Sequence, residues 1–316
     1  MRAFLPDQTR ISQVHLRTRS FEGVLPFYSD VLGLKILRQS ERQAAVSGPN
    51  GEPALIMLSE EPGAVLPTHG SSGLYHFALR YPGRASLGRA YRRLLEEGYP
   101  IAGASDHGVS EALYLSDPDG NGIELYTDRP RDQWSWRRGE IAMKTETLDV
   151  ESLLAVTEKS PEIPGAPGQT DIGHIHLHVA DLAAAERFYS EFLGLAVTQR
   201  SYPGALFFAA GAYHHHIGVN VWGGKSAPRP NSVGLISYRL EVPVTEILYC
   251  LDHRAPLLGY ETRRKEGKAL VLQIRDPNGH WMEVEASPTA ADLGSDPMWL
   301  AASGVEKGSD CFQGRE

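Results

Sequence analysis

The chain has 316 residues, 41% hydrophobic and 22% charged, which is ordinary for a globular protein of about two domains. Its formal net charge of −8, with no basic block, argues against a nucleic-acid partner, and no apolar run approaches a membrane span. Cys250 and Cys311 cannot form a disulfide framework, and the N-terminus lacks a signal-peptide segment, so we expect a cytoplasmic protein.

The first half of the chain shows the same order of elements twice: one strand, one helix and three strands. The second of these helices is predicted because Leu87, Ala90 and Leu94 form one apolar stripe at helical spacing and Gly98 is a stop signal. The elements expected in chain order are a strand at 11–18, a helix at 23–31, strands at 34–39, 43–47 and 53–58, a strand at 74–80, a helix at 85–97, and strands at 99–104, 112–116 and 122–127.

The second half repeats the first. One constant offset aligns three pairs of segments, and an offset two residues shorter aligns a fourth pair. The aligned segments are residues 11–15 with 172–176, 27–28 with 188–189, 32–34 with 193–195, and 117–120 with 276–279. The sequence therefore predicts an α+β protein of four βαβββ modules, which form two tandem domains with concave mixed sheets.

We expect domain boundaries where the repeat and the composition change. The predicted parts are an N-terminal domain at 8–130, a linker at 131–170 that is rich in proline and glycine near its end, a C-terminal domain at 171–288 and a tail at 289–316.

Three residues with metal-binding side chains occupy similar strand settings in the first half. His15, His76 and Glu124 each lie between two apolar or aromatic neighbours, so by alternation each points away from the apolar face of its strand. If the two modules of this half curl into one sheet, the three side chains converge inside it. Two imidazoles and one carboxylate with open positions suit a non-haem Fe(II) site, and Mn(II) also suits these ligands.

The segment 105–124 adds a further pattern around Glu124. His107 is followed by a five-residue spacer, an aliphatic residue, Tyr114, an Asp-Pro-Asp-Gly turn and then Glu124. This pattern resembles the extradiol dioxygenase signature, with Ser105 as one minor departure. Together with the repeated Phe-Tyr-x-x-x-Leu-Gly-Leu and Asp-Pro-x-Gly motifs, it makes the chain similar to the vicinal oxygen chelate superfamily, and most like bacterial two-domain catechol 2,3-dioxygenases.

The resemblance implies a role for each matching residue. His15, His76 and Glu124 match the Fe(II) ligands. His107 matches a residue that exchanges protons with the substrate and the bound oxygen, and Tyr114 matches one that hydrogen-bonds the substrate near the metal. The implied substrates are a small aromatic diol and O₂, and the implied reaction is ring opening beside the diol.

The N-terminal half is the predicted catalytic half. The repeat places Ser237 at the position of His76 and Gln273 at the position of Tyr114, so the second half lacks these groups. The best-known extradiol enzymes hold their metal in the C-terminal domain instead, and this chain departs from them.

A run of three histidines at 214–216 keeps a second metal site open. In glyoxalase-type members the corresponding strand supplies a ligand, so the candidate set is His176, His215 and Glu283. The alternative is that these histidines pack between the domains or hydrogen-bond around Asn220 and Trp222.

Two other functions are compatible with the same superfamily. A glyoxalase I-like isomerase or thiol transferase commonly takes a fourth ligand from the last strand of the first module, but residues 53–58 contain no donor. A drug-binding resistance module needs the cavity but neither His107 nor Tyr114. Open sheet edges are compatible with a homodimer.

Overall fold

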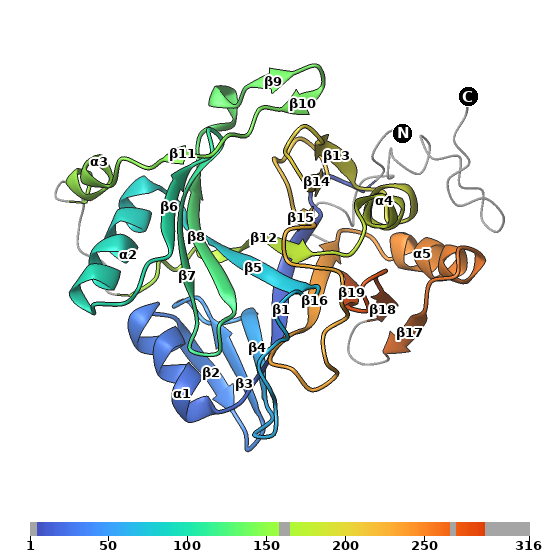
Figure 1. Cartoon of the computed structure of the whole chain (residues 1–316), viewed down its shortest axis with the longest axis horizontal. Helices are drawn as coiled ribbons and strands as arrows, with labels where there is room; N and C mark the ends of the chain where they lie inside the picture. The colour runs from blue at the N-terminus through green and yellow to red at the C-terminus, as the bar shows by residue number, and fades with distance from the viewer. Residues whose placement is uncertain (1–4, 158–164, 266–269, 288–316) are drawn as a thin grey trace.

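The computed structural model describes residues 5–157, 165–265 and 270–287, and the expected tail at 289–316 lies outside the described residues (Figure 1). Four βαβββ modules follow one another along the chain, as the repeat predicts. Module 1 contains β1 (Arg10–Thr18), α1 (Phe21–Pro26), η1 (Phe27–Val31), β2 (Lys35–Gln39), β3 (Gln43–Ser47) and β4 (Ala54–Glu60). Module 2 contains β5 (Gly73–Arg80), α2 (Arg84–Glu96), β6 (Gly103–Asp106), β7 (Ser110–Ser116) and β8 (Gly122–Asp128).

The second half repeats this order. Module 3 contains β12 (Asp171–His178), α4 (Leu182–Glu186), η3 (Arg187–Phe192), β13 (Ala196–Gln199), β14 (Ala205–Ala209) and β15 (Ile217–Asn220). Module 4 contains β16 (Gly234–Val242), α5 (Glu246–Leu257), β17 (Thr262–Lys265), β18 (Val271–Arg275) and β19 (Trp281–Ala286).

The segment expected to link the two halves carries short elements of its own. These are η2 (Arg131–Gln133), β9 (Trp136–Arg137), β10 (Glu140–Ile141), β11 (Glu146–Thr147) and α3 (Val150–Ala155). Strand β11 extends the sheet of module 2 by pairing with β6, and α3 packs beside α2. None of the helices in the described ranges is long and apolar enough to cross a membrane.

The modules pair across the two halves of the chain. One sheet has eight strands in the order β17-β18-β19-β16-β1-β4-β3-β2, and the other has nine in the order β11-β6-β7-β8-β5-β12-β15-β14-β13. Module 1 therefore shares a sheet with module 4, and module 2 shares a sheet with module 3. Figure 1 shows the two junctions, β1 beside β16 and β5 beside β12, near the middle of the molecule.

This pairing contradicts the expectation that the two modules of the first half form one concave sheet. In both junctions the first strands of two modules run antiparallel, with His15 opposite Ser237 and His76 opposite His176. Within its own module, the first strand has one edge that no strand of the same module covers. All four first strands have a similar apolar alternation, so the first strands of any two modules can form the same antiparallel hydrogen bonds.

The helix of module 2 forms as its sequence predicts. Leu87, Ala90 and Leu94 are almost fully buried against the sheet, and Gly98, with φ of +61°, takes the left-handed conformation that follows a helix end.

The repeated motifs shared by both halves hold the fold together. The Tyr28 hydroxyl in module 1 donates to Asp117 Oδ2 in module 2 at 3.0 Å, and Asp117 Oδ1 accepts from the backbone N–H of Asn121 at 2.8 Å. In the second half Tyr189 donates to Asp276 in the same way, at 2.9 Å. Since both tyrosines are fully buried, the pair satisfies polar groups that would otherwise be costly. These motifs therefore report the fold rather than the chemistry.

Candidate active site

Three adjacent strands of the nine-stranded sheet bring two histidines and a glutamate together. His76 lies on β5, Glu124 on β8 and His174 on β12, and β5 is the central strand of the three. Across the sheet, both Glu124 and His174 are in register with Ala78, two residues beyond His76 on β5. Residues two apart on a strand share a face, so all three side chains project from the same side, above the small Ala78 methyl group.

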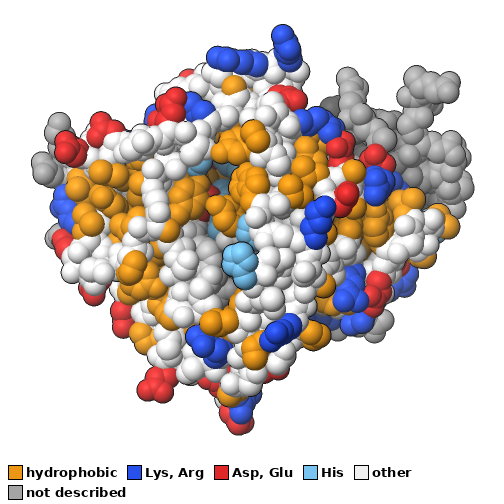
Figure 2. Space-filling view, viewed as in Figure 1, with side chains coloured by type: hydrophobic (Ala, Val, Ile, Leu, Met, Phe, Trp, Pro, Cys, Tyr) orange, Lys and Arg blue, Asp and Glu red, His pale blue; other side chains and the backbone are white. Residues whose placement is uncertain are grey.

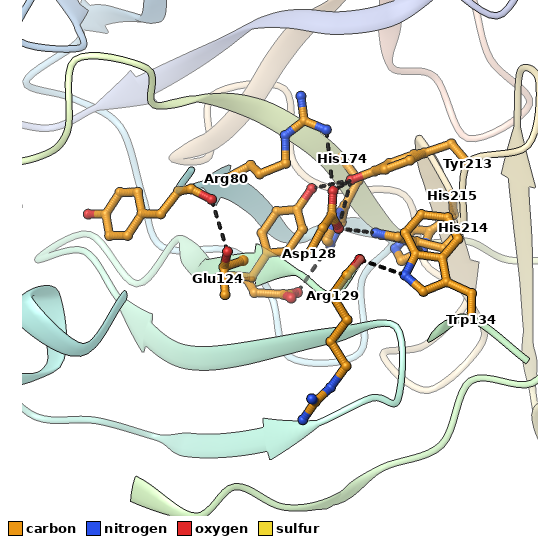
Figure 3. Close-up of polar contacts among 12 residues, drawn as sticks. Arg80, Glu124, Asp128, Arg129, Trp134, His174, Tyr213, His214 and His215 are labelled. Carbon is orange, nitrogen blue, oxygen red and sulfur yellow. Dashed lines mark hydrogen bonds and ion pairs between the residues drawn. The ribbon is translucent and has the colours of Figure 1, made fainter. Parts of the chain in front are cut away.

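The donor atoms of these three residues, which we call the triad, converge closely. His76 Nε2 and His174 Nε2 lie 3.0 and 3.1 Å from Glu124 Oε2, and the two nitrogens are 3.3 Å apart. One donor atom from each residue lies within 4.8 Å of the others, and all three residues are buried. Figure 3 shows Glu124 and His174 within the network of buried polar groups that surrounds them.

The charges of the triad favour a cation. Burial lowers the pKa of His174 to about 4, so this imidazole is neutral at physiological pH. Burial would raise the pKa of Glu124, but the neighbouring His174 and His76 hold it well below its usual range. A buried carboxylate without a cationic side chain beside it is expensive, and a divalent ion held by two nitrogens and one oxygen would compensate it. The residues therefore fit a metal.

The structure does not place His15 in this set. His15 lies on β1 in the eight-stranded sheet, and its Nε2 is 2.8 Å from Ser59 Oγ. It does not line the cavity that contains the triad. The expectation that His15 joins His76 and Glu124 is wrong because modules 1 and 2 lie in different sheets, and His174 of module 3 takes the third position.

The set expected to form a second metal site is also divided between the sheets. His176 and His215 line the same cavity as the triad, whereas Glu283 lies on β19 in the eight-stranded sheet. There Glu283 accepts a 2.8 Å ion pair from Arg239 and a 3.0 Å hydrogen bond from Gln273. These three residues therefore do not make one site. The alternative contact holds for His176, whose Nε2 is 3.0 Å from Asn220 Nδ2.

An alignment of the repeat on His176 does not identify His174 as a ligand. A different alignment finds it: His76 precedes Leu79 by three residues in the first strand of module 2, and His174 precedes Leu177 by three in the first strand of module 3. Both leucines are fully buried in the core. Matching them places His174, like His76, on the other face of its strand.

His107 and Tyr114 lie together beside the triad, as the signature implies. His107 Nδ1 is 2.7 Å from the Lys144 carbonyl oxygen, and a carbonyl only accepts, so Nδ1 carries the proton. His107 Nε2 therefore accepts from the Tyr114 hydroxyl at 2.6 Å. Tyr114 is opposite Glu124 across β7 and β8, and burial together with Glu124 raises its pKa well above the usual range.

An aromatic cavity of about 600 Å³ opens above the triad. Figure 2 shows pale-blue histidine atoms near the middle of this face, with hydrophobic side chains around them. The aromatic residues that line the cavity, apart from Tyr114, are Tyr75, Tyr202, Phe207 and Trp222. Lys144, a cation in the lining, is paired with Glu146. A planar, uncharged ring suits such a cavity.

Comparisons with known proteins show the family of the chain. The profile of the Glyoxalase/Bleomycin resistance protein/Dioxygenase superfamily matches residues 10–125 and 171–284. Over 279 residues the chain is 44% identical to the catechol-2,3-dioxygenase of Bacillus subtilis (strain 168), covering 86% of this chain and 95% of that protein. A 136-residue stretch is 29% identical to biphenyl-2,3-diol 1,2-dioxygenase 3 of Rhodococcus globerulus, covering 42% of this chain and 71% of that protein.

The fold is also found in a solved structure. Glyoxalase I from Zea mays superimposes with a TM-score of 0.56 at 16% identity, covering 88% of this chain and 92% of that one. The expected α+β class of tandem modules is confirmed, and so is the expectation of a dioxygenase-type enzyme.

Proposed function

Because the chain belongs to the glyoxalase/bleomycin resistance protein/dioxygenase superfamily, we propose a specific reaction for it: extradiol cleavage of a catechol, in which O₂ opens the ring beside the vicinal diol. The observation that carries this proposal is the convergence of His76, Glu124 and His174 beneath an aromatic cavity. The 44% identity to a catechol-2,3-dioxygenase supports the same reaction.

The triad would hold Fe(II), with Mn(II) as the alternative that these ligands also accept. When bound, such a metal supplies Lewis acidity toward the diol oxygens and a binding position for O₂. Three protein ligands leave positions for both, whereas a closed set of four would not.

The His107–Tyr114 pair presents an oxygen to the substrate. Since the Tyr114 hydroxyl donates its proton to His107 Nε2, its lone pairs remain available to accept from a substrate hydroxyl. A proton taken at Tyr114 can pass along the same hydrogen bond to His107. We therefore retain both residues as catalytic candidates.

His215, which the sequence predicts only as a possible metal ligand, is a second candidate proton acceptor. Its ring lies 4.2 Å from the His174 ring, centroid to centroid, and it lines the cavity. Burial holds its pKa well below the usual range, so the imidazole is neutral. Its Nδ1 is used in a contact with His214, and among the described residues its Nε2 has no hydrogen-bond partner. We assign Nε2 to accept a diol proton.

The test is an assay of anaerobically purified protein after Fe(II) loading. With catechol in air-saturated buffer, the proposal expects a yellow ring-opened product and one O₂ consumed per product. Turnover of methylglyoxal and thiol without O₂ uptake would replace the proposal with glyoxalase-type isomerisation. A Mn(II)-loaded sample in the same assay decides between the two metals. A cytoplasmic location and a homodimer stay predictions, and sedimentation measures the latter.

A further inference from the structure

A continuous row of hydrogen bonds leads from His215 at the cavity to two residues, His214 and Asp128, that the chemistry above does not require. Asp128 ends β8, and His214 and His215 precede β15. Asp128 Oδ1 lies 3.0 Å from His214 Nε2, and His214 Nδ1 lies 2.7 Å from His215 Nδ1. Figure 3 shows Asp128, His214 and His215 together, with Tyr213 and Arg80 around the carboxylate.

Asp128 is a fixed acceptor at the far end of this row. The Tyr213 hydroxyl donates to its Oδ2 at 3.1 Å, and Arg80 lies 3.4 Å from the same oxygen. Burial would raise the pKa of Asp128, but His214 and Arg80 lower it on balance, so the group is ionised. It also borders a separate cavity of about 280 Å³, lined by Arg80 and Asp171 among others. An ionised carboxylate can only accept hydrogen bonds.

The tautomers of both histidines follow from this acceptor. A neutral His214 donates to Asp128 through Nε2, and its Nδ1 then carries a lone pair. His215 must then donate through its own Nδ1, which leaves its Nε2 unprotonated at the cavity. A neutral imidazole carries one proton, so each assignment fixes the next.

We propose that Asp128 and His214 are positioning residues that hold His215 in the tautomer whose Nε2 accepts the substrate proton. The catalytic role that this inference gives to His215 rests on the proposed function. The tautomer of His215 does not depend on that function.

Ring packing holds the same row in place. His214 is fully buried, with its ring centroid 4.1 Å from that of Tyr213 and 5.4 Å from that of Trp134. The ring centroid of His215 is 4.2 Å from that of His174 and 5.0 Å from that of Phe207. Both rings are buried in contact with their neighbours, so we expect a change in tautomer to come from the hydrogen-bond partners.

Asp128→Asn should reverse the donor and acceptor of each hydrogen bond in the row while the hydrogen bonds themselves remain. The Arg80 guanidinium can only donate hydrogen bonds, so the amide oxygen of the asparagine must face Arg80. The NH₂ group of the asparagine must then face His214. His214 then accepts through Nε2 and donates through Nδ1, so His215 is protonated at Nε2 and cannot accept from a substrate. Asp171→Asn is the matched control, since Asp171 also pairs with Arg80, at 2.6 Å, but within the described part of the chain it makes no hydrogen bond or ion pair with a histidine.

The experiment uses the full-length chain labelled with ¹⁵N-histidine and studied metal-free by NMR, with His215 assigned from a His215→Gln variant. We expect an unprotonated Nε2 for His215 in the parent protein and in Asp171→Asn, and a protonated Nε2 in Asp128→Asn. After Fe(II) loading, kcat for catechol should fall about 10²-fold or more in Asp128→Asn, with KM nearly unchanged.

A protonated His215 Nε2 in the parent protein, or an unchanged tautomer in Asp128→Asn, overturns the inference. The parent spectrum decides the first point even if the variant does not fold. If the parent fails to cleave catechol but shows the expected tautomers, the proposed function is wrong. The conclusion that Asp128 and His214 fix the tautomer of His215 is then kept.

Discussion

Ala78 and Arg239 occupy equivalent register positions in the two sheets. Ala78 lies opposite His174 across β5 and β12, and Arg239 lies opposite Gln13 across β1 and β16. Above Ala78 there is room for the triad. At the equivalent place, the Arg239 guanidinium pairs with Glu283 at 2.8 Å and Glu285 at 2.7 Å, so the charge of the retained glutamate is already compensated. One sheet therefore keeps a carboxylate available for a metal, and the other does not.

Ala78→Arg should give the nine-stranded sheet the arrangement that Arg239 and Glu283 form in the eight-stranded sheet. The new guanidinium would pair with Glu124 and fill the space above the strand, so bound Fe(II) should fall from about one per chain to almost none. Metal analysis of protein loaded anaerobically measures this. Ala78→Ser, which adds only a hydroxyl, serves as the control and should keep its metal. Full metal content in Ala78→Arg would show that the metal binds elsewhere.

His174→Ala and His15→Ala should differ in metal affinity. His174 supplies one of the three converging donor atoms, so its loss should weaken Fe(II) binding by more than about 100-fold. His15 lies in the other sheet and contacts Ser59, so its loss should leave the affinity unchanged. Titration with Fe(II) under argon compares the two. Equal affinities, or a larger loss in His15→Ala, would contradict the triad.

His107→Phe should separate metal binding from catalysis. The aromatic ring keeps the packing at the cavity, but Tyr114 loses the acceptor 2.6 Å from its hydroxyl. We expect normal Fe(II) content with kcat reduced by about 10²- to 10⁴-fold, the range for a positioned acid or base. Steady-state kinetics with metal content measured on the same sample tests this. Full activity would remove His107 from the mechanism.

His216→Gln should flatten the pH dependence of stability. Burial, together with His214 and Arg80, lowers the pKa of His216 to about 3 in the folded chain, against about 6.5 when unfolded. Between these values the unfolded chain binds one more proton, so the free energy of unfolding falls as pH drops below about 6.5. The slope from this group is about 1.4 kcal/mol per pH unit.

In the parent protein the Ala210 N–H donates to His216 Nδ1 at 3.2 Å. The side-chain oxygen of a glutamine can accept the same hydrogen bond, but glutamine does not titrate. Urea unfolding of the metal-free protein from pH 7 to pH 5 should therefore show a shallower slope in the variant. Identical slopes would mean that His216 is not held neutral.

The sequence was sufficient to predict the modules and the site residues that module 2 contributes, but not the way the modules pair. The stripe of Leu87, Ala90 and Leu94 is a local pattern, and the helix appears where it predicts. His107, Tyr114 and Glu124 lie within one module, so their proximity follows from a single hairpin of β7 and β8 and the turn before it. Contacts inside one module survive any arrangement of modules.

The third ligand depends on which module lies beside module 2, and no local pattern decides that. His15 and His174 both lie on first strands with suitable alternation, and both strands expose an edge that can pair. The choice between them is a property of the whole fold. The histidine run at 214–216 shows the same limit, because its hydrogen bonds to Asp128 cross between modules 2 and 3.

We propose above that this chain inserts O₂ into a catechol. Fe(II)-loaded enzyme and catechol under ¹⁸O₂ test it directly, with the product analysed by mass spectrometry after reduction of the exchangeable aldehyde. The account predicts a ring-opened product in which both new oxygen atoms come from ¹⁸O₂. A product without ¹⁸O, or no product while methylglyoxal is turned over, would contradict it.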